Sequence, residues 1–134
     1  MMLVGTCWTG ALFRVVLRLI VNRPRPNPLL VRMEQKPKGK SFPSGHVVAS
    51  VTFWGWLFIL GLQHLKGQQK ALLSIPALLM TWIGPARIYS GQHWTSDVLG
   101  GYLLGGAWLG LSLRLYLALR RKHVVAQAGQ KHLK

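Results

Sequence analysis

Four long apolar stretches, separated by short polar segments, dominate the chain. They cover about residues 2–22, 47–63, 71–89 and 98–119. Each is apolar on all sides. None shows the period-2 alternation of a half-buried strand or the period-3.6 apolar stripe of a half-buried helix. A helix that spans a bilayer needs roughly 20 such residues. The pattern therefore predicts an all-α, integral membrane helical bundle of about four spans within residues 1–122, followed by a basic tail at 123–134.

Residues that end or pack helices support this division. Three prolines at alternate positions between Asn22 and Pro28 end the first helix, because proline removes a backbone donor and restricts the residue before it. Arg14 and Arg18 lie inside this helix, where an arginine that faces lipid is costly. Both should therefore face the bundle interior or reach toward an interface. The glycines of the fourth stretch predict close packing against another helix.

The chain carries an extreme positive charge. Seventeen Lys and Arg residues against two acids give +15 over 134 residues, although only 14% of the residues are charged and 50% are hydrophobic. Such a charge suits a nucleic acid or an anionic membrane surface. Nucleic acid is excluded as a partner, since it needs a soluble basic face and this chain has none. Cys7 is the only cysteine, which excludes a disulfide scaffold and a zinc module.

An up-and-down order of the spans brings three polar clusters to one side of the membrane. In the first cluster, Arg18 and Arg25 are seven residues apart, about two helical turns, and so lie near one face, with Arg14 on the same stripe. Two converging guanidinium groups suit a tetrahedral oxyanion. Alternatively, these arginines are flanking charges of the kind that orient membrane helices.

The second cluster is Pro43-Ser44-Gly45-His46, directly before an apolar helix. Ser44 is a natural N-cap, and a helix N-terminus offers unpaired N–H groups to an anion. Gly45 allows a ligand to approach the backbone. His46 is either a solvated histidine or, beside an oxyanion, a candidate proton donor.

The third cluster runs from Arg87 to Asp97. His93 and Asp97 are four residues apart, close enough for the carboxylate to accept the Nδ1 proton and leave Nε2 as a nucleophile. Asp97 could instead cap the fourth helix or complement its dipole. The other acid, Glu34, lies in a basic loop and is expected to be solvated.

Three motifs occur in chain order, namely Arg18-x6-Arg25-Pro26, Pro43-Ser44-Gly45-His46 and Arg87-x5-His93-x3-Asp97. Together they resemble the signature of the type 2 phosphatidic acid phosphatase and vanadium haloperoxidase superfamily, in its membrane lipid phosphatase branch. The second motif alone would match by chance at roughly one in 10⁵ start positions. Two positions depart from the signature. Arg18 replaces its usual Lys, which keeps the charge but not the shape, and Ala86 replaces a Ser.

The resemblance implies a role for each motif residue. The phosphate would be held by Arg18, Arg25, Ser44, Gly45 and Arg87. His93 would attack phosphorus to form a phosphohistidine, Asp97 would orient His93, and His46 would protonate the leaving oxygen. Neither a metal nor a cofactor is implied, because the arginines and the helix N-terminus supply the positive charge that a metal would bring.

The expected function is metal-independent hydrolysis of a lipid phosphate or diphosphate. Undecaprenyl diphosphate, phosphatidate and phosphatidylglycerophosphate are all open as substrates. Two alternatives are a catalytically inactive relative that binds anionic lipid and a vanadate-dependent haloperoxidase, although relatives of the second kind are soluble and larger. Membrane members of the family typically have six helices, with the first motif after the third. The resemblance therefore also implies that this chain lacks the first two helices.

The basic residues outside the spans predict the orientation only after a correction. Seven Lys and Arg residues fall on each side of the membrane, which gives no orientation. Arg25 and Arg87 are assigned to phosphate, and discounting them leaves five on the motif side. The Lys66 loop and the tail should then be cytoplasmic. The active site should face the periplasm or lumen, with the protein in the plasma (inner) membrane.

Overall fold

The computed structural model describes residues 2–27, 31 and 39–131, with side chains described over 4–27, 31 and 39–122. Its elements in chain order are α1 (Met2–Val21), α2 (Gly45–His64), a short 3-10 helix η1 (Gly67–Leu73), α3 (Ser74–Tyr89) and α4 (Thr95–Lys131). These ranges contain no strand. The all-α fold class is therefore confirmed. Glu34, which the sequence predicted to be solvated, lies outside the described residues.

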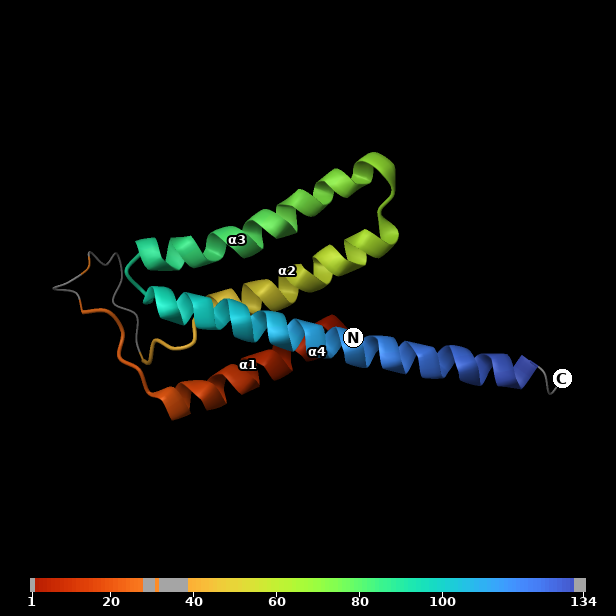
Figure 1. Ribbon diagram of the computed structural model, residues 1–134, viewed down its shortest axis with the longest axis horizontal. Helices are drawn as coiled ribbons and strands as arrows, with labels where there is room; N and C mark the ends of the chain where they lie inside the picture. Colours follow the sequence, from red (N-terminus) through yellow and green to blue (C-terminus); the bar gives the residue numbers. More distant parts are fainter. Residues whose placement is uncertain (1, 28–30, 32–38, 132–134) are drawn as a thin grey trace.

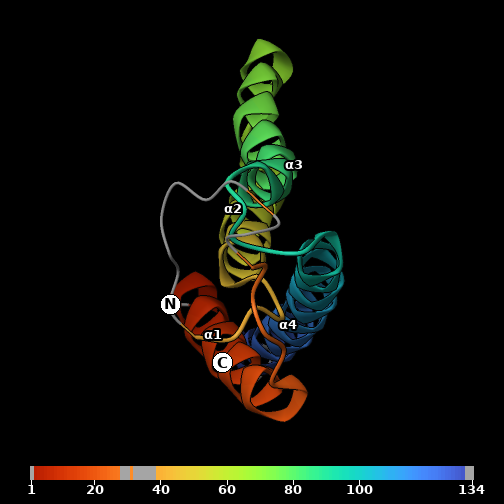
Figure 2. The ribbon, with the colours of Figure 1, turned by 90° about the vertical axis from the view of Figure 1, so that its left-hand side faces the viewer.

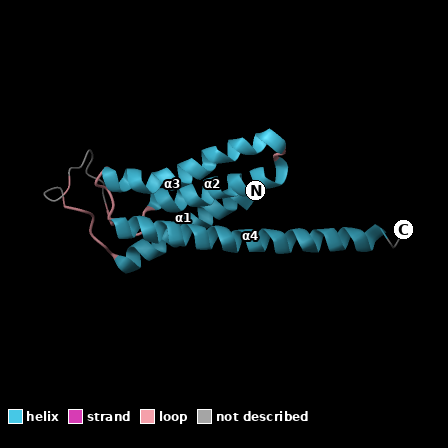
Figure 3. Ribbon diagram, turned by 45° about the horizontal axis from the view of Figure 1, so that its top comes forward, coloured by secondary structure: helices cyan, strands magenta, loops and turns pink. Residues whose placement is uncertain are grey.

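The helices form an open bundle whose polar loops share one end. In Figure 1, α2 and α3 form a hairpin in the upper half, and α1 and α4 lie below it. The last turns of α1 and α3 and the first turns of α2 and α4 all lie at the left-hand end. Figure 3 shows that helices make up nearly the whole described chain and that α4 runs far beyond its neighbours at the opposite end. The up-and-down order expected from the sequence is therefore confirmed.

Four segments are long and apolar enough to cross a membrane. They are Val4–Val21, Gly45–His64, Gly67–Tyr89 and Thr95–Lys122. Much of their apolar surface points outward, since Trp8, Trp82 and Leu103 are each more than 70% exposed. An apolar exterior is the arrangement expected of helices surrounded by lipid. Helix α4 continues to Lys131, so most of the stretch described as a basic tail is also helical.

Glycines of α4 allow α2 to pack closely against it. A Cβ atom added to Gly101 would lie 3.0 Å from Val47 Cβ and 3.1 Å from the Ser44 carbonyl oxygen. One added to Gly105 would lie 2.9 Å from Val51 Cβ. Larger residues at these two positions would force the helices apart. By contrast, a Cβ on Gly106 would meet no described atom within 4 Å, so only some of the glycines serve this packing.

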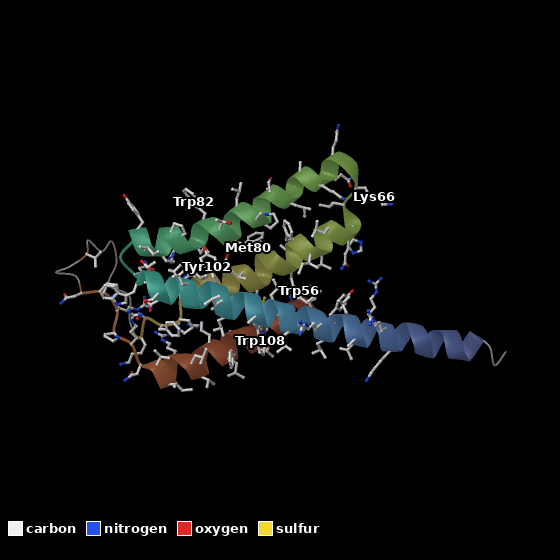
Figure 4. The ribbon with its side chains drawn as sticks, in the orientation of Figure 1. Trp56, Lys66, Met80, Trp82, Tyr102 and Trp108 are labelled. Carbon is white, nitrogen blue, oxygen red and sulfur yellow. The ribbon has the colours of Figure 1, made fainter. Side chains whose placement is uncertain are left out.

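A tyrosine of α4 repairs a break in α3. Pro85 lacks an N–H group, so the carbonyl of Thr81, four residues earlier, loses its helical donor. The hydroxyl of Tyr102 lies 2.7 Å from that oxygen and 3.0 Å from the Met80 oxygen, and it accepts a hydrogen bond from Gly84 N–H at 3.1 Å. Figure 4 shows Tyr102 between α4 and α3. This contact fixes the last turns of α3, which include Arg87, the first residue of the third polar cluster.

Replacement of Tyr102 by Phe should therefore destabilise the bundle. The change removes one hydroxyl and leaves polar backbone groups of α3 without a partner, at a cost of about 1–2 kcal/mol in the free energy of unfolding. Thermal unfolding in detergent measures this loss. Tyr89→Phe is the matched control, because Tyr89 is 87% exposed. Equal unfolding temperatures for the two variants would contradict the proposed repair of α3.

Candidate active site

The three polar clusters meet at one end of the bundle. Figure 2 views this end directly and shows the loop after α1, the start of α2 and the turn between α3 and α4 lying together. A backbone hydrogen bond ties two of the clusters, since Ser44 N–H donates to the Asp97 carbonyl oxygen at 3.0 Å. Another links the first cluster to the loop before α2, from Ser41 N–H to the Arg23 oxygen at 2.9 Å. Residues far apart in sequence are thus held in one site.

Asp97 is the centre of this arrangement. Its side chain is fully buried at the start of α4. One carboxylate oxygen, Oδ2, accepts the Trp94 backbone N–H at 2.9 Å, and the other, Oδ1, forms an ion pair with Arg23 Nη1 at 3.2 Å. Arg23 also donates to Ser96 Oγ at 2.6 Å. The carboxylate is therefore held on both sides, because a buried polar group needs such partners.

His93 lies between this carboxylate and an arginine. Its Nδ1 atom is 3.6 Å from Asp97 Oδ2, and its Nε2 atom is 3.5 Å from Arg25 Nη1. The side chain is buried, with 5% of the residue surface exposed. Burial lowers the pKa of His93 and the charge of Arg25 lowers it further, whereas Asp97 opposes the shift. A neutral imidazole with Nε2 turned toward a cation can act as a nucleophile toward a bound anion.

A polar cavity of about 340 Å³ lies on the Nε2 side of His93. Its lining includes Arg14, Arg18, Arg25, Lys40, His46 and His93. Arg25 is fixed in place, because it donates to the Gln92 carbonyl oxygen at 2.7 Å and to the Gly39 oxygen at 3.2 Å. Burial and the charge of Arg18 lower the pKa of Arg25, which shows how closely the cations are crowded. A cavity of this charge suits a phosphate-sized anion.

The start of α2 forms one wall of the cavity. Gly45 and His46 both line it, and a Cβ atom on Gly45 would lie 2.7 Å from Arg14 Nη1. A larger residue at this position would displace that guanidinium from the cavity wall. Ser44 occupies the N-cap position with extended backbone, but its side chain makes no capping hydrogen bond, contrary to the expected role. Instead, Ser44 Oγ is buried without a partner among the described residues.

Arg87 lies near the cavity without being one of its lining residues. Its Nη1 atom donates to Gln92 Oε1 at 3.1 Å, and its Nε atom is buried with no partner within the described part of the chain. Its positive charge nevertheless acts on His46, which lines the cavity.

The structure also brings to the site three cations to which the sequence assigned no role in binding phosphate. Arg14 and Lys40 line the cavity, and Arg23 pairs with Asp97. Arg14 had a signal in the sequence, since it continues the stripe of Arg18 and Arg25. Neither Lys40 nor Arg23 belongs to a recognisable motif, because each reaches the site through the fold of its loop.

The comparisons with known proteins agree with this geometry. Residues 1–121 match the family model described as the PAP2 superfamily. Phosphatidylglycerophosphatase B of Bacillus subtilis (strain 168) is 30% identical over 102 residues, which make up 72% of this chain and 48% of that relative. An undecaprenyl-diphosphatase of Sulfolobus acidocaldarius is 34% identical over 85 residues, or 58% of this chain and 34% of that relative.

A solved structure has the same fold. It is described as the crystal structure of the first transmembrane PAP2 type phosphatidylglycerolphosphate phosphatase from Bacillus subtilis. It superposes with a TM-score of 0.76 at 25% sequence identity, covering 87% of this chain and 58% of that chain. The present chain thus spans about half or less of the length of the curated relatives that it matches.

The position of His93 predicts a measurable titration. Histidine-labelled protein in detergent should show His93 titrating below its usual value of about 6.5, because burial and Arg25 disfavour the charged form. Removing the positive charge in Arg25→Gln should raise the apparent pKa, whereas Arg114→Gln, on the far part of α4, should leave it unchanged. An NMR titration decides the matter. A His93 pKa at or above 6.5, or one insensitive to Arg25→Gln, would contradict this electrostatic account.

Proposed function

Because this chain belongs to the PAP2 superfamily, we propose that it is a membrane phosphatase that hydrolyses a lipid phosphate or diphosphate without a metal ion. Residues 1–122 would form the membrane phosphatase domain, followed by the basic tail at 123–134. Phosphatidylglycerophosphate and undecaprenyl diphosphate, which appear in the names of the relatives, are both candidate substrates, as is phosphatidate.

One observation carries this proposal. The Nε2 atom of His93 is directed at a cationic cavity, 3.5 Å from Arg25 Nη1, while its Nδ1 atom faces the buried Asp97 carboxylate at 3.6 Å. A histidine that binds phosphate covalently needs a free Nε2, a proton fixed on Nδ1, and cations around the oxygens of the transferred group. Arg25 and the other cavity cations supply the third requirement. Nδ1 has no hydrogen-bond partner among the described residues and Nε2 lies within reach of Arg25, so substrate binding would have to close the 3.6 Å gap to Asp97 and draw Arg25 away from Nε2.

The proposed reaction has two steps. His93 Nε2 attacks phosphorus, the bond from phosphorus to the leaving oxygen breaks, and that oxygen takes a proton from His46. A water molecule then gives a proton back to His46 and attacks the phosphohistidine, which releases inorganic phosphate and restores His93. Arg18, Arg25 and Arg87, together with Ser44 and Gly45 at the start of α2, would hold the phosphate oxygens. Asp97 would stabilise the charged imidazole.

An apolar groove supports a lipid-linked substrate. A groove of about 360 Å³ runs between α1 and α4 and is lined by residues that include Leu17, Phe42, Leu103 and Leu104. It shares Pro43 with the cationic cavity. A headgroup in the cavity could therefore be continuous with an apolar chain in the groove. Apolar lining next to a few polar groups is typical of ligand sites.

We also propose an orientation. The site would face the periplasm or lumen from the plasma (inner) membrane, with the Lys66 loop and the tail in the cytoplasm. The support comes from the basic residues that remain once Arg25 and Arg87 are assigned to phosphate. A cysteine placed at Gln130 in a Cys7→Ser background should resist an impermeant thiol reagent in intact cells. Labelling without permeabilisation would contradict this orientation.

Phosphate release from lipid substrates tests the proposed activity. The chain in detergent should hydrolyse at least one lipid phosphate or diphosphate in excess chelator. His93→Ala should lower the rate by at least about 10³, because the covalent route is lost. The matched control is His64→Ala, which changes an exposed histidine at the far end of α2.

Three results would contradict the proposal in different ways. Activity abolished by chelator would overturn the metal-free mechanism. Equal activity in the His93 and His64 variants would remove His93 as the nucleophile. No phosphate release from any lipid would favour an inactive relative that binds anionic lipid.

A further inference from the structure

Arg14 is a charged residue that the proposed reaction does not use. It lies inside the membrane-spanning part of α1, one turn before Arg18, and is half-buried. A charged side chain at this depth is costly and most often marks a functional site. Within the described residues Arg14 has no acidic partner, because Asp97 is already engaged by Arg23 and His93. Its guanidinium instead lines the cationic cavity.

Arg14 lies on the His46 side of this cavity. A Cβ atom on Gly45 would lie 2.7 Å from Arg14 Nη1 and 2.9 Å from its Cζ, so the guanidinium rests against the residue directly before His46. The positive charges that act on His46 are those of Arg87, Arg14 and Arg25. At the other side of the cavity, Arg25 Nη1 lies 3.5 Å from His93 Nε2. Arg14 is therefore a neighbour of His46 and not of His93, whereas the charge of Arg25 reaches both histidines.

The position of Arg14 near His46 determines which part of the substrate it can contact, because phosphoryl transfer has a defined geometry. The attacking and leaving atoms lie roughly in line on opposite sides of phosphorus. With His93 as the attacking group and His46 as the proton donor, the leaving group departs on the His46 side. Arg14 is then beside the leaving group, whereas Arg25 is beside the transferred phosphate. A neutral alcohol would gain little from a cation there, but an anionic leaving group would gain a charge-assisted hydrogen bond.

The charge and the volume of the cationic cavity also indicate space for a second anionic group. Arg14, Arg18, Arg25 and Lys40 line one cavity, and their positive charges repel one another until an anion is bound. A single phosphate ester carries about two negative charges at most. The cavity also has a volume of about 340 Å³. This equals the volume of on the order of ten water molecules at about 30 Å³ each, and it is larger than the volume of one phosphate group.

We propose that Arg14 binds a second phosphate, carried by the leaving group, and that the chain prefers lipids with two phosphate groups in the headgroup over lipids with one. The second phosphate is either linked directly to the first, as in a diphosphate, or separated from it by a short linker, as in a glycerophosphate headgroup. This inference rests on the proposed function, because it assigns His93 and His46 to opposite sides of the reacting phosphorus.

The test compares substrates that differ in one phosphate. Farnesyl diphosphate and farnesyl monophosphate share the same chain, and phosphatidylglycerophosphate supplies the linked arrangement. Arg14→Gln should lower kcat/KM by about 10- to 100-fold for at least one substrate with two phosphates, and by at most about threefold for the monophosphate. Arg14→Lys should recover part of the loss. Arg114→Gln, which removes an arginine of α4 outside the cavity, is the control and should have no effect.

The outcomes separate the inference from the proposed function. Equal losses on all three substrates would overturn the role of Arg14 while leaving the phosphatase activity intact. A selective loss on farnesyl diphosphate alone assigns the second phosphate to a diphosphate, and one on phosphatidylglycerophosphate alone assigns it to the linked headgroup.

If no substrate is hydrolysed, the proposed function fails, and binding decides the inference. Inorganic pyrophosphate should bind more tightly than inorganic phosphate by calorimetry, and Arg14→Gln should weaken pyrophosphate binding by about 10-fold or more. Equal affinities for the two anions, or an Arg14→Gln variant with unchanged pyrophosphate affinity, would contradict the inference.

Discussion

The buried carboxylate of Asp97 is the constraint on which the site depends. A carboxyl group with no exposed surface is stable only if its surroundings supply hydrogen-bond donors or cations. Here the donors come from Trp94, on the turn before α4, and from Arg23, on the loop after α1. The Asp97 main-chain oxygen also accepts the Ser44 N–H at the start of α2. Three segments that the membrane spans bring to one end are thereby locked together.

The crowded cations are the counterpart of this constraint. Because Asp97 neutralises Arg23, the arginines of α1 and its loop face the cavity without a nearby acid among the described residues. Their mutual repulsion disfavours an empty cavity and favours an anion. The same positive charge would stabilise the charge that develops on a transferred phosphate, which is the part that a metal ion plays in metal-dependent phosphatases. Burial favours the neutral form of His93, which the proposed attack on phosphorus requires.

Local patterns predicted much of this architecture. The apolar stretches gave the four spans, and residue spacing placed His93 near Asp97. The patterns failed where contacts are long-range. Nothing local links Arg23 to Asp97, 74 residues away, or Tyr102 to the carbonyl that Pro85 leaves unpaired. Side-chain propensity also misled at one point, because Ser44 is the N-cap residue by position and yet makes no cap hydrogen bond.

The account rests on His93 as the group that receives phosphate, and trapping the intermediate tests this most directly. The chain would be mixed with a lipid substrate labelled in its terminal phosphate, quenched in alkali, digested and mapped by mass spectrometry. The account predicts an acid-labile, alkali-stable phosphate on the peptide that contains His93, and no label in His93→Ala. Label on another residue, or turnover by His93→Ala at the rate of the unaltered chain, would contradict it.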